Sequence, residues 1–459
     1  MTVQCSPYPA YKPSGIPWLG DIPAHWEVKS LKTALLKNDG GVWGDDIQND
    51  EAGIIVLRST DIGLLGEWTI IDPARRKLSL LELSSSKLLE GDLLVTKSSG
   101  STLHLGKTAI VTKEVELLEC CYSNFMQRLR AKPQYSPKFI FWIMNSGVGR
   151  NQLNFLGSTT TGLNNLTAKL IGNITISAPP LPEQQAIAEY LDHETARLDA
   201  VIAAYRRLLV LLDEKRRTLI TQAVTRGLDP TAPLKDSGIE WLGQIPAHWV
   251  AKRLKNLVSK IGSGKTPRGG SEIYSCEGVI FIRSQNVHFD GLHLDDVVYI
   301  DYEIDKEMRS TRLQGNDILL NITGASLGRA TLVPQKFPDA NVNQHVSIIR
   351  PKTNLIYPPF LNHIIGSSLI QAQIFSTENG AAREGLPYSK IANLVFAMPE
   401  NYQEQQAIAT YLDQETTRLD GLKTKIETLL ARLGEYRAAL ISAAVTGKID
   451  VTQIHQELA

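Results

Sequence analysis

The sequence predicts an α+β protein built as a tandem repeat, with two mixed, strand-rich globular domains separated by a pair of long antiparallel coiled-coil helices. Three observations predict this class. Two blocks of sequence occur twice, the regions between them hold short apolar runs broken by Gly, Pro and Asn, and each copy ends in a long stretch with coiled-coil spacing. A chain written twice in this way is expected to be pseudo-twofold.

The composition is that of a globular protein without an export or membrane signal. The chain has 459 residues, of which 43% are hydrophobic, enough for several cores. Its amino-terminal stretch lacks a basic region followed by an apolar core, and no run of about eighteen apolar residues occurs. We therefore expect a cytoplasmic protein. The four cysteines match neither a disulfide framework nor zinc-ligand spacing, and we expect reduced thiols at Cys5, Cys120, Cys121 and Cys276.

The repeated blocks define the frame of the chain. SGIPWLGDIPAHW at 14–26 recurs as SGIEWLGQIPAHW at 237–249, with 11 of 13 positions identical. EQQAIAEYLDHETARLD at 183–199 recurs as EQQAIATYLDQETTRLD at 404–420, with 14 of 17 identical. The two shifts are 223 and 221 residues, so few net insertions separate the copies.

Between these blocks the copies diverge but keep landmarks. VLRSTDI at 56–62 corresponds to FIRSQNV at 281–287, and GDLLVTKSSGSTLHLGKTAIV at 91–111 corresponds to NDILLNITGASLGRATLV at 316–333. Short apolar runs bounded by turn residues predict a strand-rich domain of about 150 residues in each copy. A shared framework with different detail is therefore expected.

A coiled-coil helix is predicted after each globular region. From Glu183 to Val224, apolar residues recur at alternating intervals of four and three, and no proline or glycine interrupts them. A helix of about 42 residues reaches roughly 60 Å and cannot bury its own stripe. We expect the two helices to pair antiparallel, with a globular domain at each end; alternatively, each helix packs on its own domain as ordinary core. The seam positions are Ile187, Leu191, Leu198, Val201, Tyr205, Leu208, Leu212 and Leu219, with gaps at Glu194 and Lys215, and in the second copy Ile408, Leu412, Leu419, Leu422, Ile426, Leu429, Leu433 and Leu440, with Tyr436 in place of Lys215.

The string GSGKT at 262–266 resembles the end of a phosphate-binding loop, but its surroundings do not fit one. The first glycine of such a loop would stand five residues before Gly264, where the chain has Ser259. Pro267 and the glycines after Arg268 disfavour the helix that must follow. The first copy has NDGGVWG at 38–44 in this place, so we predict a variable surface loop rather than a nucleotide site.

Other candidate catalytic motifs also have plainer interpretations. An amino-methyltransferase needs Asn or Asp before Pro-Pro-aromatic, whereas YPPF at 357–360 offers a phenol and predicts a helix that starts with proline. The cluster DEK at 213–215 lies within the predicted helix, where its side chains point in different directions. His25 and His248 precede Trp26 and Trp249 without a second ligand type, which indicates packing or capping.

At these residues the chain resembles the specificity subunits of type I restriction-modification systems over nearly its whole length. The most specific resemblance is ISAPPLPEQQAIAEYLD at 176–192, similar to the family's strand, proline-rich turn and Glu-Gln helix start. AMPENYQEQQAIATYLD at 397–413 departs by lacking the double proline. Also family-like are GKTP at 264–267, RSTDI and RSQNV, SSGSTLHLGK, NITGASLGR and NVNQHVSIIRP at 341–351. Their order, repeated in both copies, carries the resemblance.

The resemblance implies a non-catalytic subunit that reads an asymmetric, two-part double-stranded DNA sequence in defence against foreign DNA. Its implied partners are two methyltransferase subunits and the endonuclease/translocase subunits. S-adenosylmethionine, Mg and ATP would belong to those partners, and no cofactor or metal is expected in this chain. The implied division is an amino-terminal leader at 1–26, target recognition domain 1 at 27–180, helical region 1 at 181–229, a linker and repeated leader at 230–249, target recognition domain 2 at 250–400, and helical region 2 with the tail at 401–459.

DNA contacts are expected from loops that differ between the copies. Basic side chains suit phosphates and guanine, and hydroxyl and amide groups suit base edges. With 48 basic and 48 acidic residues, binding must rely on local groups rather than on net charge. The candidates are Arg58, Lys97, Ser98, Ser99, Ser101, Lys107, Arg128, Arg130, Thr159, Thr160 and Thr161 in the first copy, and Lys265, Thr266, Arg268, Arg283, Gln285, Asn286, Asn321, Thr323, Arg329, Gln344 and Arg383 in the second.

A second function remains open from the residues alone. The balanced charge also suits a coiled-coil protein-interaction scaffold whose two domains bind proteins without reading DNA. Exchanging the first divergent domain distinguishes the two functions, because only a DNA reader would then change one half of a methylated sequence.

Overall fold

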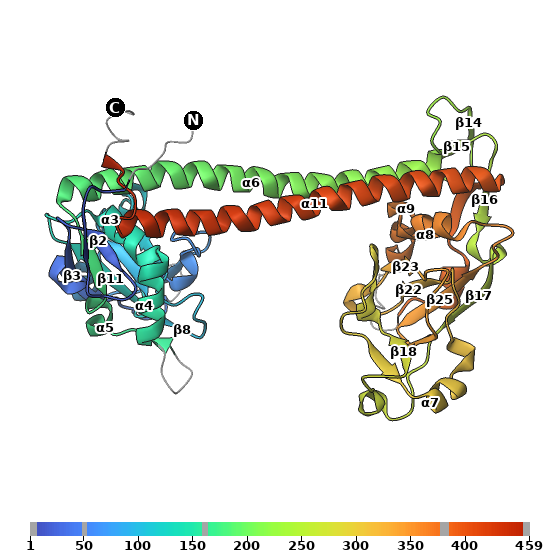
Figure 1. The fold of residues 1–459 in the computed structure, drawn as a ribbon, viewed down its shortest axis with the longest axis horizontal. Coiled ribbons are helices and arrows are strands. Elements are labelled where there is room, and N and C mark those ends of the chain that lie inside the picture. The colour runs from blue at the N-terminus through green and yellow to red at the C-terminus, as the bar shows by residue number, and fades with distance from the viewer. Residues whose placement is uncertain (1–6, 48–52, 158–163, 377–384, 453–459) are drawn as a thin grey trace. The chain divides into compact units, whose positions relative to one another are not determined.

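The computed structural model describes residues 7–47, 53–157, 164–376 and 385–452. It divides into two compact units, residues 1–205 with 428–459 and residues 206–427. Each unit contains one strand-rich domain and a part of both long helices, α6 (Leu181–Arg226) and α11 (Tyr402–Val445) (Figure 1). In the described part of the chain, no helix is long and apolar enough to cross a membrane.

The domain of the first unit is built on a four-stranded antiparallel sheet in the order β4-β11-β7-β9. A three-stranded sheet, β10-β5-β6, contains the parallel pair β10–β5. Three two-stranded pairs, β1–β2, β3–β13 and β8–β12, complete it. The strands are β1 (Tyr11–Pro13), β2 (Asp21–Pro23), β3 (Glu27–Ser30), β4 (Leu35–Gly40), β5 (Ile54–Leu57), β6 (Ala74–Arg76), β7 (Leu93–Thr96), β8 (Ser98–Ser99), β9 (Thr108–Ile110), β10 (Cys121–Tyr122), β11 (Met126–Ala131), β12 (Asn164–Asn165) and β13 (Thr175–Ala178), and the helices are α1 (Leu80–Ser86), α2 (Lys113–Glu116), α3 (Pro137–Asn145), α4 (Gly147–Gly157) and α5 (Ala168–Gly172).

The domain of the second unit repeats this plan. Its four-stranded antiparallel sheet has the order β17-β25-β22-β23, and its three-stranded sheet, β21-β18-β24, again contains one parallel pair, β18–β24. The pairs β14–β15, β16–β26 and β19–β20 complete it. The strands are β14 (Leu234–Asp236), β15 (Gln244–Pro246), β16 (Trp249–Arg253), β17 (Val258–Ser263), β18 (Val279–Ile282), β19 (Val287–His288), β20 (Gly291–Leu292), β21 (Val298–Ile300), β22 (Ile318–Asn321), β23 (Ala330–Leu332), β24 (Ala340–Val342), β25 (Val346–Pro351) and β26 (Val395–Pro399), and the helices are α7 (Tyr302–Glu307), α8 (Pro358–Gly366), α9 (Ser368–Phe375) and α10 (Tyr388–Ala392).

One inner strand of each four-stranded sheet, β7 or β22, reads as a largely apolar run because both of its faces are buried. In β7, Leu93 and Val95 belong to one hydrophobic core, while Leu94 points to the opposite face and belongs to a second. In β22, Ile318 and Leu320 likewise belong to one core, and Leu319, on the opposite face, belongs to another. The predicted duplication of a strand-rich domain is therefore confirmed at the level of the sheets.

Each unit also contains antiparallel contacts between the two long helices. In the second unit, Asp213 pairs with Lys423 and Arg216 with Asp420, so that residue numbers rise along α6 as they fall along α11. In the first unit, the Arg437 guanidinium donates two hydrogen bonds, of 2.9 and 3.1 Å, to the Asp199 carboxylate. The 221-residue shift of the repeat relates this pair to Asp420 and Arg216.

The helix ends, by contrast, join the domain cores, so both packing arrangements considered from the sequence occur. Leu191 and Leu440 share one core cluster with the strands of the first unit. Some predicted seam positions are corrected: Val201, Leu422 and Tyr436 are 39, 43 and 56% exposed, and Leu208 is 37% exposed. Contact with one partner helix buries a narrower stripe than the apolar pattern covers.

An acidic residue in the first turn of each helix, buried in the first copy and half-buried in the second, contacts the leader of its own unit. The Glu183 carboxylate accepts hydrogen bonds from the Trp26 indole at 3.0 Å and lies 2.9 Å from the His25 ring. Glu404 has the same partners, Trp249 at 2.9 Å and His248 at 3.0 Å. A carboxylate at a helix amino terminus is stabilised by the helix dipole. The two histidines thus pack at a domain entrance.

Candidate nucleic-acid interface

Loops from separate strands meet at one junction in the domain of the second unit. They follow β17, β18 and β22, and they join the β24–β25 turn and the segment before α10. Hydrogen bonds between backbone groups connect all of them. These bonds run from Gly264 N to Val346 O (3.1 Å), Lys265 N to Val342 O (3.1 Å), Asn343 N to Ile282 O (3.0 Å), Ile322 N to His345 O (3.0 Å) and Leu386 N to Ile322 O (2.8 Å).

The first unit has the same junction at the aligned residues. Its bonds run from Gly41 N to Met126 O (3.4 Å), Val42 N to Tyr122 O (2.9 Å), Ser123 N to Leu57 O (2.9 Å), Lys97 N to Phe125 O (3.0 Å) and Leu166 N to Lys97 O (2.7 Å). Because backbone groups make these bonds, the side chains of the loops can differ between the two junctions without altering the connections. We call these surfaces junction 1 and junction 2.

Close backbone approach explains the glycine of the GSGKT string. A Cβ on Gly264 would lie 1.9 Å from the Val342 carbonyl oxygen, and one on the aligned Gly41 would lie 2.1 Å from that of Tyr122. The loop is followed by a 3₁₀ helix at Gly270–Ile273, not by the α-helix of a phosphate-binding loop. The glycine therefore serves junction 2, while Lys265, Thr266 and Arg268 are exposed beyond it.

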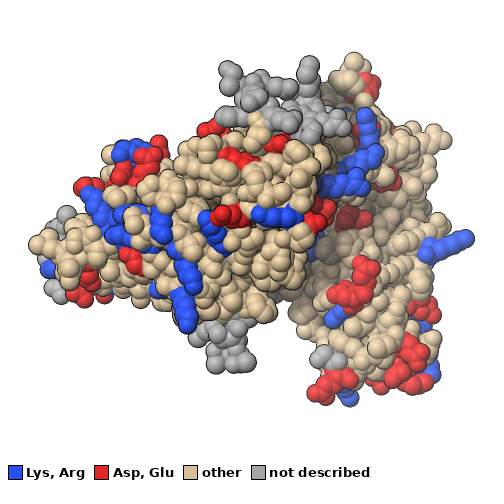
Figure 2. Space-filling view, turned by 60° about the vertical axis from the view of Figure 1, so that its left-hand side comes forward, with Lys and Arg blue, Asp and Glu red and all other residues tan. Residues whose placement is uncertain are grey.

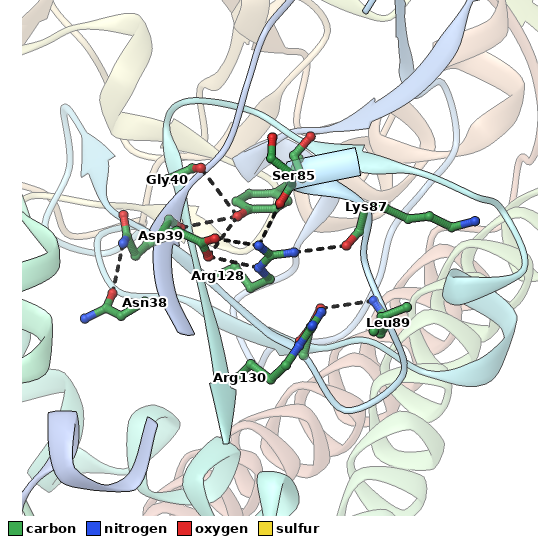
Figure 3. A network of polar contacts seen from close by, with 12 residues as sticks. Asn38, Asp39, Gly40, Ser85, Lys87, Leu89, Arg128 and Arg130 are labelled. Atoms are coloured by element: carbon green, nitrogen blue, oxygen red, sulfur yellow. Dashed lines mark hydrogen bonds and ion pairs between the residues drawn. The ribbon is translucent and has the colours of Figure 1, made fainter. Parts of the chain in front are cut away.

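Two of the predicted DNA-contacting cations are instead structural. Arg128 is 1% exposed; its guanidinium bonds the Asp39 carboxylate and the carbonyl oxygens of Ser85 and Lys87 (Figure 3). Lys107 is 4% exposed and donates to the carbonyl oxygens of Ser59 and Ile62, and burial lowers the pKa of its ammonium group. Neither side chain reaches the surface, so both predictions are wrong.

Arg130 also pairs with a residue inside the fold. Its guanidinium makes a two-pronged ion pair with the buried Asp92, at 2.6 and 2.7 Å. The aligned Arg350 pairs with the buried Asp317 at 2.7 Å for both bonds. An ion pair at the same place in both domains supports the fold, and a DNA contact by Arg130 stays a prediction.

Two predicted amides are also buried, which corrects their assignment to base edges. Asn286 accepts from the Arg283 backbone N–H at 2.9 Å and donates to the His293 carbonyl at 2.9 Å. Asn321 donates to the Ser284 carbonyl at 2.7 Å. Both are 0% exposed and hold the loops of junction 2 in place.

The remaining candidates lie at or beside the junctions. Arg58 and Arg283 occupy aligned positions, and each donates to a backbone carbonyl, that of Asp72 at 2.6 Å or of Asp296 at 2.7 Å. Lys97 is half-buried without an ion-pair partner among the described residues, and burial lowers the pKa of its ammonium group. Ser101, Gln285 and Gln344 are exposed, and Ser98, Ser99, Thr323 and Arg329 are half-buried. Thr159, Thr160, Thr161 and Arg383 lie outside the described residues.

Sequence reasoning missed three side chains here. Phe125, 56% exposed, projects from junction 1 at the position where junction 2 has His345, whose ring bonds the Thr323 hydroxyl at 2.7 Å. Arg150 on α4 donates to the Leu103 carbonyl at 2.7 Å and has a buried nitrogen without a hydrogen-bond partner. Alignment of the two copies around 121–130 and 341–350 marks Phe125 and His345 as differing residues, whereas no local pattern distinguishes Arg150.

The surface charge is mixed. On the face shown in Figure 2, basic and acidic side chains are interspersed, in keeping with 48 residues of each sign in the chain. Any affinity for a polyanion must therefore come from local groups such as Lys97 and Lys265.

A duplicated chain with two equivalent backbone junctions that present different side chains defines a tandem-repeat protein with two similar domains and two unlike surfaces. The family model for the type I restriction modification DNA specificity domain matches residues 66–202 and 246–431. The chain belongs to this family. The family describes a DNA specificity function, and the alternative of a scaffold without DNA readout is not favoured.

Curated relatives agree with this assignment. The EcoKI specificity subunit of Escherichia coli (strain K12) is 24% identical over 372 residues, covering 80% of this chain and 76% of the relative. The putative MjaX specificity subunit of Methanocaldococcus jannaschii is 22% identical over 441 residues, covering 94% of this chain and 96% of the relative. The chain thus matches specificity subunits along most of its length.

Solved structures show the same fold. The HsdS subunit from Thermoanaerobacter tengcongensis has a TM-score of 0.54 at 18% identity, covering 93% of this chain and 98% of that one. A chain from a study of complex assembly and conformational transition of the type I R-M system has a TM-score of 0.70 at 16% identity, covering 93% and 99%. The predicted architecture of two domains with long helices is confirmed.

Proposed function

We propose that this chain reads an asymmetric, two-part DNA sequence, with one half read at junction 1 and the other at junction 2. The observation that carries the proposal is that the two junctions share every backbone bond described above while presenting different side chains. Lys97 and Phe125 in junction 1 align with Ile322 and His345 in junction 2. Two junctions with the same backbone bonds and different side chains suit the reading of two different half-sites.

Within each junction, the proposal divides positioning from reading. Lys97 and Lys265 would contact phosphates, because each is a cation without an ion-pair partner among the described residues. Gln285, Thr323 and Gln344 would contact base edges through amide and hydroxyl groups. The buried Arg128 and Asn286, and the half-buried Arg130, would act indirectly, by holding the loops that carry these groups.

The partners in this proposal are two methyltransferase subunits, joined by endonuclease/translocase subunits for cleavage. Support comes from apolar residues that are exposed to similar extents in both copies. Trp18 and Trp241 are 52 and 50% exposed, and Val201 and Leu422 are 39 and 43% exposed. Two equivalent surfaces of this kind suit two identical partner subunits.

The chain itself performs no chemical step in this proposal. S-adenosylmethionine, Mg and ATP belong to the partner subunits, and methyl transfer to adenine takes place there. The chain acts in the cytoplasm with those partners. Purified alone, it should transfer no methyl group, and adding the methyltransferase subunit should supply the activity.

A domain exchange tests the reading of half-sites. Residues 27–180 are replaced by the corresponding domain of another family member, and residues 250–400 in a second variant, and methylated sites are sequenced in cells that also carry the partners. We expect each exchange to change one half of the methylated sequence and leave the other intact. A methylated sequence that stays the same in both halves, or loss of partner binding as the sole effect, would instead support a scaffold and contradict the proposal.

A further inference from the structure

The turn of the β19–β20 hairpin in the second unit gathers three side chains that bind metals. His288 ends β19, Asp290 lies in the turn, and His293 follows β20. One ligand atom from each lies within 4.8 Å of the other two. His288 is half-buried, and the other two residues are exposed.

The hydrogen bonding of His288 leaves one ring nitrogen ready to coordinate. Its Nε2 lies 2.8 Å from the Gln285 carbonyl oxygen. Because a carbonyl oxygen only accepts, this nitrogen carries the hydrogen and Nδ1 keeps a free lone pair. A ring N–H bonded to a backbone carbonyl is the arrangement that orients histidine ligands in metal sites.

The other two ligand atoms are already close to coordination spacing. His293 Nε2 and Asp290 Oδ1 are 3.2 Å apart, and the two imidazole rings stack with centroids 4.0 Å apart and planes at 14°. Two atoms that are each about 2.1 Å from a tetrahedral zinc ion are about 3.4 Å apart. The spacing of these atoms fits one ion, and the two stacked rings must turn out of their parallel arrangement for both lone pairs to point at it.

The backbone of the hairpin is held independently of any ion. The His293 N–H donates to the Asn286 carbonyl at 2.9 Å, and the Asn286 side chain returns a bond of 2.9 Å to the His293 carbonyl. Gly291 in the turn adopts φ 143°. The corresponding hairpin of the first unit, residues 62–69, contains no histidine. The three side chains are thus a feature of the second domain that the first copy of this hairpin does not repeat.

We propose that His288, Asp290 and His293 bind one divalent ion of the zinc class. Two imidazole nitrogens with one carboxylate favour Zn²⁺, Co²⁺, Ni²⁺ or Cu²⁺, whereas Ca²⁺ and Mg²⁺ need more oxygen ligands. Three protein ligands leave a coordination position for water. The ion fixes the hairpin beside the exposed Gln285, next to junction 2. This inference goes beyond DNA reading and does not depend on it.

Zinc titration of the full-length chain, prepared without a histidine tag, tests the site. Calorimetry measures affinity and stoichiometry, thermal unfolding measures stabilisation, and visible absorption of bound Co²⁺ reports the coordination. The test variants are His288→Asn, His293→Gln and Asp290→Asn, which change side chains that are exposed or half-buried. The control is His193→Gln, an exposed histidine on α6 that lies 3.2 Å from the Glu194 carboxylate and belongs to no three-residue group among the described residues.

We expect one zinc ion per chain, with affinity at least about tenfold weaker in either histidine variant and unchanged in the control. Zinc should raise the unfolding temperature of the wild-type and control chains but not of the histidine variants, whose metal-free unfolding should match the wild type. Absence of zinc binding by the wild-type chain, or zinc affinity in His288→Asn and His293→Gln equal to that of the wild type, would overturn the proposal. Loss of zinc affinity in His193→Gln would also overturn it, since it would place the ion elsewhere.

Discussion

Replacing Gly264 with alanine should destabilise the second unit, because this glycine permits a close backbone contact. The added methyl carbon would lie 1.9 Å from the Val342 carbonyl oxygen, where ordinary contacts begin at 3.4 Å. The two chain segments would have to separate by about 1.5 Å, the difference between these distances. The bonds at 3.1 Å from Gly264 to Val346 and from Lys265 to Val342 would then lengthen.

Overpacking of this kind costs about 1–3 kcal/mol, and a contact with rigid backbone belongs at the upper end of that range. In a unit of this size, about 3 kcal/mol lowers the unfolding temperature by roughly 6–12 °C. Denaturant and thermal unfolding of the full-length chain measure the change. The matched control is Gly434→Ala on α11, where an added Cβ meets nothing within 4 Å. That substitution should stabilise the helix by about 0.5–1 kcal/mol.

The two glycine substitutions are therefore expected to change the free energy of unfolding in opposite directions. If Gly264→Ala left stability unchanged or raised it as Gly434→Ala does, the close contact would not exist in solution. Lys265→Ala should leave the stability unchanged, because this exposed side chain makes no internal contact that stabilises the fold among the described residues. If Gly264 instead served to bind a nucleotide, the Gly264→Ala variant would keep the stability of the wild type and lose nucleotide binding.

Three further predictions concern DNA and partners. Lys97→Ala should reduce the slope of log affinity against log salt by about 0.9 for the assembled complex, whereas Lys32→Ala, whose ammonium already bonds Asn173, should not; equal slopes would exclude a phosphate contact at Lys97. Trp18→Ala and Trp241→Ala should each weaken the binding of one methyltransferase subunit by about 2 kcal/mol, and native mass spectrometry counts the subunits that stay bound. Loss of both subunits from a single substitution would contradict the idea of two equivalent surfaces. Seven residues added to both α6 and α11 at the unit boundaries lengthen each helix by about 10 Å. The spacer between the two half-sites of the methylated sequence should grow by about three base pairs. A change in the half-sites themselves would refute the link between helix length and spacer length.

Patterns that repeat along the chain predicted the frame because their physical causes are local or periodic. The heptad spacing from Glu183 onward predicts a long helix, and α6 does extend over Leu181–Arg226. The matched blocks predict two similar domains, and their sheets have equivalent strand orders. The seam was less certain, since Val201 and Tyr436 fit the periodicity and yet remain exposed. Spacing specifies a face of a helix but not how much of that face its partner covers.

The candidate site was harder to predict because the fate of a polar side chain depends on residues far away in sequence. Arg128 has the composition and setting of a DNA contact, yet its partner Asp39 lies 89 residues earlier. Arg130 pairs with Asp92, 38 residues earlier. One comparison within the chain could have found the second pair, because Arg350 and Asp317 stand at the aligned positions, and a base-reading residue has no reason to recur with its counter-ion.

The same reasoning explains how one fold can carry two specificities. At each junction, backbone groups make the connections between loops, so replacing Lys97 by isoleucine, as junction 2 does at Ile322, leaves the bond to residue 125 or 345 in place. Ion pairs of the buried Asp92 and Asp317 with half-buried arginines hold the inner strands whatever the loops contain. Since breaking such a pair costs about 3–5 kcal/mol while an exposed loop side chain costs little, substitutions that alter recognition and substitutions that unfold the domain fall on separate residues. If the junctions read DNA as proposed, the chemistry of reading is in this way uncoupled from the stability of the domain that presents it.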